Sequence, residues 1–274
     1  MINKVEMLIT VKIQILCLLF FNIHVLSAQE GGIDDLHSMD LYLCIGQSNM
    51  AGRALLQPEL MDTLQNVYLL NDKGEFEPAV NPLNRYSTIR KDLSMQRLGP
   101  VYSFAKELSK ETGRPIGLIV NARGETVIQD WLKGSPKGYY KEALERVRVA
   151  LRSGGVLRAI LWHQGEGNSG FPESYRKRLT DLVESFRQDL NAPQLPFVFG
   201  EISQWEKWAP KGTKGFNEML NEMATIIPYS ACVSSKGLDM YKDESDPHFG
   251  TKGQLLLGKR YAEEIMKLVP VYKR

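Results

Sequence analysis

The chain has 274 residues, with 34 Lys and Arg against 32 Asp and Glu, and a formal net charge of +2. Hydrophobic residues at 43% and charged residues at 24% describe an ordinary globular protein with a substantial core, which excludes a disordered chain, a collagen and a coiled coil. Because the charge excess is small and no block of like charges occurs, nucleic acids and other polyanions are not expected partners.

The first 28 residues differ in composition from the rest of the chain. Two lysines precede an apolar run over residues 13–21, and small residues at positions 27 and 28 follow it. This layout predicts a secretory signal peptide. A membrane anchor and a buried helix are the alternatives, but the run is shorter than the ~20 residues that span a bilayer. We therefore predict a protein that is secreted or periplasmic, without stable membrane insertion after signal removal, with three segments: a signal peptide (1–28), an N-terminal linker (29–39) and one domain (40–274).

Three cysteines are present, and Cys17 falls in the predicted signal peptide. Cys44 and Cys232 each lie in an apolar stretch, where a free cysteine behaves as a small buried hydrophobe. We expect core thiols, since a disulfide would require the two residues to be neighbours in space.

From residue 40 onward, short apolar runs alternate with amphipathic segments. Near-continuous apolar runs are typical of strands that are buried on both faces of a parallel sheet. These runs lie at 41–46, 66–70, 116–120, 157–162, 197–202 and 230–234. Helical periodicity and flanking Pro and Gly residues predict helices at 100–113, 139–152, 173–190 and 252–268. The alternation predicts a single doubly wound α/β domain.

Two stretches, 71–98 and 203–215, fit neither a strand nor a helix. Long loops in a compact domain usually carry function or are mobile. In an open α/β sheet, ligands bind at the carboxyl ends of the strands, so the residues that follow each predicted strand are the candidates for chemistry.

The first predicted strand is followed by the polar turn GQSNMAG, residues 46–52, which leads into a predicted helix. This turn places the Ser48 hydroxyl at the ligand end of the sheet, with its backbone N–H near a helix N-terminus that favours developing negative charge. The arrangement is like a nucleophile elbow without the G-x-S-x-G pattern. Alternatively, Ser48 or Asn49 only caps the helix. The motif alone does not decide between these readings.

The fourth predicted strand ends in WHQGEGN, residues 162–168, which brings an amide, a glycine and a carboxylate to the same sheet edge. A metal site is disfavoured, because no second histidine lies near His163 and the H-E-x-x-H pattern is absent. We expect His163 to be a hydrogen-bonded residue packed beneath the site, and we predict no metal and no cofactor.

The segment DPHFG, residues 246–250, precedes the last predicted helix. Nucleophilic catalysis by serine needs a base near the hydroxyl and an acceptor that orients the base. His248, with Asp246 two residues before it, supplies both from one loop. His24 falls in the predicted signal peptide and His37 in a polar N-terminal stretch, so His248 is also the best base by elimination.

Four ordered blocks, GQSNMAG, NARGETVIQDW (121–131), WHQGE and DPHF, resemble the successive motifs of the SGNH-type esterases. More narrowly, they resemble carbohydrate esterase family six and the related sialate O-acetylesterase-like proteins, a group related to acetylxylan esterases. The resemblance extends from about residue 40 to residue 268. It implies a three-layer αβα sandwich with a mainly parallel, flavodoxin-like sheet, and hydrolysis of acetyl esters on carbohydrates without a cofactor.

Carried over by motif, the resemblance implies that Ser48 is the nucleophile, His248 the base and Asp246 the orienting acid. It also implies an oxyanion hole that is formed by the backbone N–H groups of Ser48 and Gly124 with the side-chain amide of Gln164.

The chain departs from the family pattern at two places. Gly124 is followed by Glu125, where many members have a second glycine. The acid often stands three residues before the histidine, where this chain has Ser245, whereas Asp246 is two before it. In some relatives the glutamate of the HQGE block is the third member, so Glu166 is an alternative acid or a substrate contact. We favour Asp246, because a carboxylate in the same loop as the histidine orients it with little added ordering.

The function predicted is that of a secreted serine esterase that removes O-acetyl groups from acetylxylan, other acetylated glycans or sialic acids through an acetyl-enzyme. One alternative is an SGNH lipase or lysophospholipase that acts on longer acyl esters, for which the polar loop 71–98 gives little sign of an acyl channel. Another is a non-catalytic glycan-binding protein, against which the retention of Ser48, Gln164 and His248 argues. The sugar, the acetylated position and the oligomeric state stay open.

Four further side chains are candidates for substrate contact. Trp205 and Trp208 either form a platform for a sugar ring or anchor their loop to the body of the protein. Arg85 and Arg123 either meet a carboxylate on a sialic or uronic acid or are solvated or paired with Glu125.

Overall fold

A computed structural model describes residues 39–205, 207–208 and 213–272. The predicted signal peptide lies outside the described residues, as does the predicted linker apart from its last residue. Among the described residues, no helix has both the length and the apolar character needed to cross a membrane.

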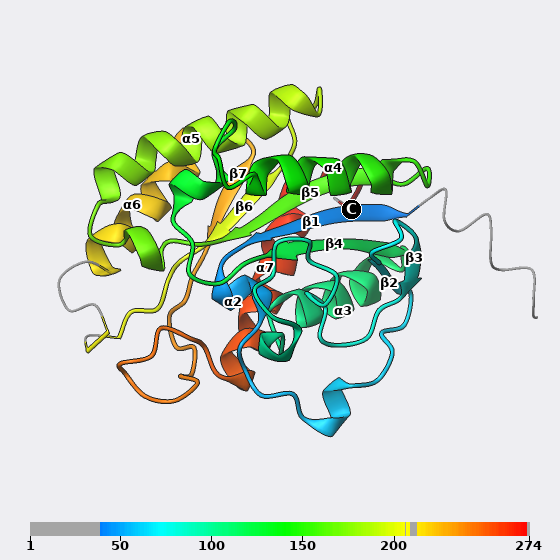
Figure 1. Cartoon of the computed structure of the whole chain (residues 1–274), viewed down its shortest axis with the longest axis horizontal. Helices are drawn as coiled ribbons and strands as arrows, with labels where there is room; N and C mark the ends of the chain where they lie inside the picture. The colour runs from blue at the N-terminus through cyan, green and yellow to red at the C-terminus, as the bar shows by residue number, and fades with distance from the viewer. Residues whose placement is uncertain (1–38, 206, 209–212, 273–274) are drawn as a thin grey trace, which may run out of the picture. The chain divides into compact units, whose positions relative to one another are not determined.

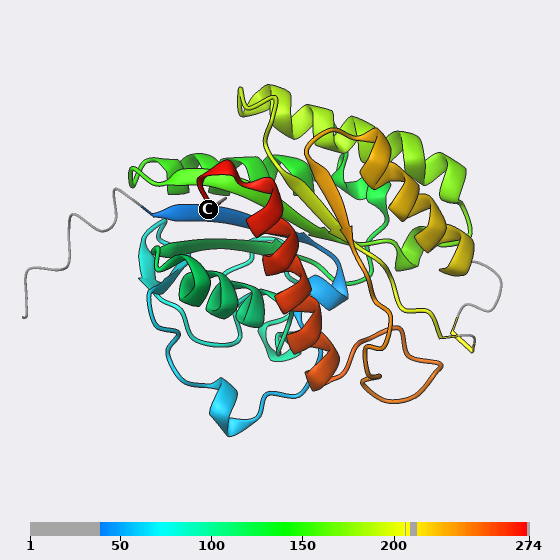
Figure 2. The same cartoon turned by 180° about the vertical axis from the view of Figure 1, so that it is seen from behind.

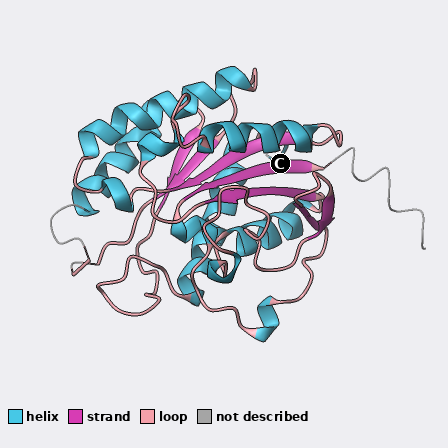
Figure 3. Ribbon diagram, viewed as in Figure 1, coloured by secondary structure: helices cyan, strands magenta, loops and turns pink. Residues whose placement is uncertain are grey.

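Seven strands form one sheet, in the order β3-β2-β4-β1-β5-β6-β7 (Figure 3). The strands are β1 (Asp40–Gly46), β2 (Val67–Leu70), β3 (Phe76–Pro78), β4 (Ile116–Ala122), β5 (Val156–His163), β6 (Phe197–Gly200) and β7 (Ser230–Val233). All neighbouring pairs are parallel except β2 and β3, which form an antiparallel pair. The six predicted strands are confirmed. β3 was not predicted, because it is short and half-buried at the sheet edge, where no apolar run is required.

The order of the strands fixes where a ligand site lies. The sheet contains the flavodoxin strand order 2-1-3-4-5, in which β1, β4, β5, β6 and β7 are strands 1 to 5 in chain order. β2 and β3 are added to this sheet outside β4. β1 therefore lies between β4 and β5, and the carboxyl ends of these three strands are in register at Gly46, Ala122 and His163. The strand order reverses at this point, which is where ligands bind in open α/β sheets.

Helices cover both faces of the sheet, as the two opposite views show (Figures 1 and 2). The helices are α2 (Ser48–Ala51), α3 (Val101–Thr112), α4 (Tyr139–Leu151), α5 (Pro172–Asp189), α6 (Thr213–Ile226) and α7 (Thr251–Leu268). α3 packs against α7 on one face, and α4 and α5 lie on the other, with α6 beside α5. Short 3-10 turns occur at Pro58–Leu60, Leu93–Met95, Ile128–Trp131, Glu166–Asn168 and Pro270–Tyr272. The three-layer αβα architecture is confirmed.

The predicted helices match the observed ones to within a residue or two at each end. Pro100 lies just outside α3 as its N-cap, and Gly113 ends the helix in the left-handed conformation with φ 67°. α6 was not predicted. Its apolar face is regular, with Phe216, Met219 and Leu220 buried, but the proline and glycines before Phe216 conceal where the helix begins.

The amino end of β1 is fixed by a cluster of charged and phenolic groups. Arg158 Nε donates to Asp40 Oδ1 at 2.6 Å and Tyr272 Oη donates to Asp40 Oδ2 at 2.5 Å, and Arg114 also pairs with this carboxylate. Burial alone would raise the pKa of Asp40, but these hydrogen bonds hold it below its ordinary value. This cluster is structural, because it lies at the sheet edge opposite the carboxyl ends of the strands.

Both cysteines of the described chain are free, as expected. Cys44 on β1 is buried and Cys232 on β7 is half-buried, and β5 and β6 separate their strands.

Candidate active site

Ser48 begins α2 directly after β1 because the turn at Gly46 is very tight. Gly46 has φ 135°, and a Cβ at this position would lie 2.1 Å from the backbone oxygen of His163, so only glycine fits. Gln47 N–H then donates to that same oxygen at 2.8 Å. Gln47, rather than Ser48 or Asn49, occupies the N-cap position of α2. The capping alternative therefore does not account for the Ser48 side chain.

A hydrogen-bonded series joins Ser48, His248 and Asp246. The Ser48 Oγ to His248 Nε2 distance is 2.8 Å, and the His248 Nδ1 to Asp246 Oδ1 distance is 2.5 Å. Because a carboxylate only accepts hydrogen bonds, Nδ1 carries the proton and Nε2 is left to accept from the serine hydroxyl. Asp246 Oδ1 also accepts from the backbone N–H of His248 at 2.9 Å, which fixes the carboxylate within its own loop.

The environment of His248 favours the neutral imidazole. Burial lowers its pKa below the ordinary value, and the charges of Arg53 and Lys242 lower it further, whereas Asp246 raises it in part. A neutral ring can accept the serine proton. Ser245, which stands where many relatives carry the acid, instead bonds to Asp243 through its hydroxyl and backbone N–H.

Glu166, the alternative acid, does not bond to His248. Its side chain is buried, and Oε1 accepts from Asn49 Nδ2 at 2.7 Å, while Oε2 has no hydrogen-bond partner. Burial raises the pKa of Glu166 to about 7. Of the two candidate acids, Asp246 is therefore the one in contact with the imidazole.

Gly124 lies in the loop after β4, next to Ser48. A Cβ on Gly124 would lie 3.5 Å from the Ser48 Cβ and 2.6 Å from Arg53 Nη2. The next residue, Glu125, has φ 59°, in the left-handed region that favours glycine. The Glu125 backbone thus adopts a conformation that glycine favours, and the Glu125 side chain pairs with Lys91.

The structure does not bring the Gln164 side chain into the cleft beside Ser48. Gln164 is buried, and its Nε2 donates to Gln47 Oε1 at 3.1 Å, Thr126 O at 3.0 Å and Asn168 Oδ1 at 3.1 Å. These acceptors occupy the amide hydrogens, so the predicted donor role in the oxyanion hole finds no support in this arrangement. Gln164 instead ties together the loops that follow β1, β4 and β5.

His163 packs beneath the site, as expected. Its ring is fully buried, with Nδ1 3.1 Å from the Tyr261 hydroxyl. Burial lowers the pKa of His163 to about 3, so the ring stays neutral. In the described part of the chain, no three His, Cys, Asp or Glu side chains gather as metal ligands would.

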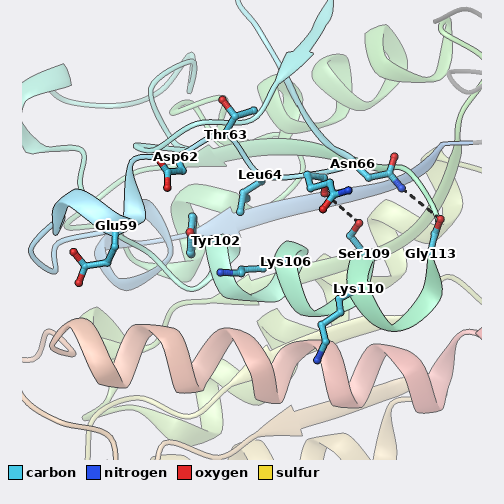
Figure 4. Close-up of a pocket in the computed structure, with 11 residues that line it drawn as sticks. Glu59, Asp62, Thr63, Leu64, Asn66, Tyr102, Lys106, Ser109, Lys110 and Gly113 are labelled. Atoms are coloured by element: carbon cyan, nitrogen blue, oxygen red, sulfur yellow. Dashed lines mark hydrogen bonds between the residues drawn. The ribbon is translucent and has the colours of Figure 1, made fainter. Parts of the chain in front are cut away.

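Ser48 and His248 open into a cleft of about 470 Å³. Its other lining residues are Arg53, Ser94, Met95, Arg97, Gly124, Glu125, Tyr241, Lys242 and Asp246. Loop 71–98 supplies one wall, and it is held to β4 because Asn84 bonds to both the N–H and the C=O of Ala122. A larger groove of about 550 Å³ lies between residues 59–66 and α3 (Figure 4), but it contains none of the predicted catalytic residues.

Three cations in the cleft were not predicted from the sequence. Arg53 Nη1 donates to the carbonyls of Gly52 and Met95, and Arg97 Nη1 donates to the Tyr241 hydroxyl at 2.9 Å. Within the described residues, no carboxylate lies at ion-pair distance from Arg53, Arg97 or Lys242. The position of Arg53, directly after GQSNMAG, was the only available signal.

Arg85 and Arg123, the two arginines proposed from the sequence as substrate contacts, lie outside the cleft. Arg85 pairs with Glu77 at 2.7 Å, and Arg123 Nη1 donates to the carbonyl of Ile89 at 2.6 Å. Neither arginine lines the cleft.

The two tryptophans likewise do not line the cleft. Trp205 packs edge-on against Phe249, with 5.7 Å between ring centroids, so it anchors its loop to the segment that carries His248. Trp208 is half-buried.

A parallel α/β sheet with a Ser-His-Asp series at its switch point is an arrangement typical of carboxylic ester hydrolases. Residues 38–267 match the family described as carbohydrate esterase, sialic acid-specific acetylesterase, and the chain belongs to this family. It is thus a carboxylic ester hydrolase, and the resemblance seen in the sequence is confirmed.

Two relatives extend the comparison. The chain is 28% identical over 244 residues to a probable carbohydrate esterase of Arabidopsis thaliana, covering 81% of this chain and 88% of that one. The crystal structure of that plant protein matches with a TM-score of 0.71 at 25% identity, over 84% of this chain and 98% of the other. A carbohydrate acetylesterase from Xanthomonas citri shares the fold, with a TM-score of 0.62 at 19% identity, over 85% of this chain and 58% of the other.

Proposed function

We propose that this protein is an exported serine esterase that removes O-acetyl groups from carbohydrates through an acetyl-enzyme on Ser48. The observation that carries the proposal is the Ser48, His248 and Asp246 series within a cleft at the switch point of the sheet. The family supplies the substrate class, because its description names carbohydrate esterases and a sialic acid acetylesterase.

In the proposed mechanism, His248 Nε2 takes the Ser48 proton as Oγ attacks the acetyl carbonyl. The backbone N–H groups of Ser48 and Gly124 are the candidate donors to the oxyanion, and losing one such donor typically costs about 3 to 4 kcal/mol of transition-state stabilisation. The imidazolium then protonates the sugar oxygen as it leaves. Water attacks the acetyl-enzyme with His248 again as base, which releases acetate and restores the serine hydroxyl.

The lining of the cleft favours a short acyl group over a long one. Among the described residues that line the cleft, Met95 is the only aliphatic side chain longer than alanine, and the rest are polar, charged, aromatic or glycine. A lipase acting on long chains would need a continuous apolar channel, so this alternative has no supporting observation. The intact hydrogen-bonded series likewise favours an enzyme over a degenerate binding protein.

The cations of the cleft favour acetylated sugars that carry a carboxylate. Arg53 and Arg97 line the cleft with Ser48, and no carboxylate among the described residues lies at ion-pair distance from either. An arginine fork matches a carboxylate in two parallel hydrogen bonds. Glu125 adds a negative charge to the cleft, but Lys91 pairs with it. Sialic and uronic acids are therefore preferred over neutral xylan within the proposed substrate class.

Acetate release tests both the function and this preference. We expect a higher kcat/KM on O-acetylated sialic or uronic acids than on acetylated xylan and acetylated neutral monosaccharides, and a steep loss of activity as the acyl chain lengthens. Arg97→Gln should lower kcat/KM on the acidic sugars by about tenfold, through a lost charge-assisted hydrogen bond. Arg85→Gln is the matched control, because Arg85 pairs with Glu77 outside the cleft. Equal rates on acidic and neutral sugars, with no effect of Arg97→Gln, would contradict the preference.

Export is proposed on the composition of residues 1–28 alone. N-terminal sequencing of protein recovered from the periplasm or medium of expressing cells should find a chain that begins at Gln29. Recovery of the intact chain, starting at Met1, from the cytosol would overturn this part of the proposal.

A further inference from the structure

Asn49, the residue after the proposed nucleophile, is fully buried, and its side-chain amide makes four hydrogen bonds. Nδ2 donates to Glu166 Oε1 at 2.7 Å and to the Pro247 carbonyl at 3.1 Å. Oδ1 accepts from the Phe249 backbone N–H and from Gln254 Nε2, both at 3.1 Å. An amide has two donor hydrogens and two acceptor lone pairs, so its capacity is fully used.

Two of these bonds hold the backbone on either side of the base. Pro247 and Phe249 flank His248 in the chain. The Asn49 side chain on α2 therefore forms hydrogen bonds to the backbone immediately before and immediately after His248. Since Asn49 is also the chain neighbour of Ser48, the positions of nucleophile and base are tied through a single residue. Ser48 Oγ and His248 Nε2, the two atoms joined through this residue, are 2.8 Å apart.

Glu166 helps to determine which way the Asn49 amide faces, together with the Pro247 carbonyl and the Phe249 N–H. Flipping the amide would turn its oxygen toward the Glu166 carboxylate and its NH2 toward the Phe249 N–H, which places acceptor against acceptor and donor against donor. Glu166 is buried with Oε2 unpartnered, a costly arrangement that apolar packing would avoid. The hydrogen bond to Asn49 accounts for a carboxylate at this buried position.

We propose that Asn49 is a positioning residue that sets the geometry between Ser48 and His248, and that Glu166 acts through Asn49 as its orienting partner. This inference rests on the proposed esterase function and assigns Glu166 a role other than that of the triad acid. It explains why a carboxylate that does not touch the imidazole lies beneath the site.

The test uses three variants of the full chain, assayed by acetate release. Asn49→Ala should lower kcat by about 10²-fold with little change in KM, because misplacing a catalytic group by about 1 Å costs a factor of this size. Glu166→Leu should lower kcat by about tenfold in the same way, since it removes one of the hydrogen bonds that orient the amide and leaves an Nδ2 hydrogen without its acceptor. Glu166→Gln should recover most of the wild-type kcat, because its oxygen still accepts from Asn49.

Asn217→Ala is the matched control. Asn217 is a buried asparagine that grips the backbone N–H and C=O of Ile202 at 3.0 and 2.9 Å, without a contact to Ser48 or His248. It should lower thermal stability as Asn49→Ala does, yet keep kcat per folded molecule. If Asn49→Ala does not fold, the kcat values of Glu166→Leu and Glu166→Gln test the positioning role by themselves.

The outcomes separate this inference from the proposed function. A wild-type protein that releases no acetate and is not labelled by a fluorophosphonate refutes the proposed function itself. With an active wild type, an unchanged kcat in folded Asn49→Ala, or in Glu166→Leu, overturns the positioning role. A Glu166→Gln variant as impaired as Glu166→Leu also overturns it, because the charge of Glu166 would then matter rather than its hydrogen bond.

Discussion

Ser48→Ala is expected to abolish acetate release and to prevent labelling by a fluorophosphonate. Removing the nucleophile of a serine hydrolase typically lowers kcat by about 10⁶-fold, which leaves only the contribution of substrate binding and the oxyanion donors. Folding should be kept, because Ser48 contributes a hydroxyl to His248 and only its backbone to α2. The measurement is hydrolysis of p-nitrophenyl acetate and of an acetylated sugar by the purified variant.

Ser203→Ala is the control for this variant. Ser203 is a fully buried serine that follows β6 near the same edge of the sheet, and its hydroxyl has no hydrogen-bond partner among the described residues. It should keep wild-type activity and labelling. Hydrolysis by Ser48→Ala at the wild-type rate would show that the acetyl group is transferred to another residue or directly to water, and would refute the acetyl-enzyme on Ser48.

The fold was predictable because its strands are buried on both faces. Runs such as LYLCIG and IGLIV contain almost no polar residues, and Gly113 and the proline after it mark where α3 ends. β3 and α6 were missed for opposite reasons. β3 is a short edge strand that needs no apolar run. α6 has a regular apolar face, but glycines near its first residues hide the start of the helix in the sequence.

The candidate site was predictable only where its residues follow strands in recognisable blocks. Ser48, Gly124 and His248 were placed correctly beside one cleft, because parallel strands end at a common edge. Arg53, Arg97 and Lys242 were missed, because irregular loops without periodicity bring them there. Arg85 and Arg97 lie in the same polar loop, and nothing in the sequence shows that, of these two, only Arg97 lines the cleft.

The direction of a side chain is a further limit of the sequence. Gln164 and Glu166 stand in one block at the correct edge of the sheet, but both turn inward to bond with Gln47 and Asn49. Whether an amide faces the cleft or the loops behind it depends on which buried acceptors compete for its hydrogens. Those acceptors come from loops that are distant in sequence.

Asp246→Asn should lower kcat by about 10⁴-fold, the loss that is typical when the orienting carboxylate of a serine triad becomes an amide. A carboxylate only accepts from Nδ1, whereas an amide can also donate to it, which stabilises the tautomer with the proton on Nε2. That tautomer cannot take the Ser48 proton. If Glu166 were the triad acid, Asp246→Asn would cost little and Glu166→Gln would produce the large loss.

The pH profile of Asp246→Asn provides a second, independent readout. His248 must be neutral to act as base, so kcat/KM rises with pH through its pKa, which burial holds below the ordinary value of about 6.5. Asp246 raises this pKa, because its negative charge and its hydrogen bond favour the protonated ring. Removing the charge should therefore move the acidic limb of the variant's profile to still lower pH. A limb that moved to higher pH, or stayed in place while kcat fell, would mean that Asp246 does not act on His248 electrostatically.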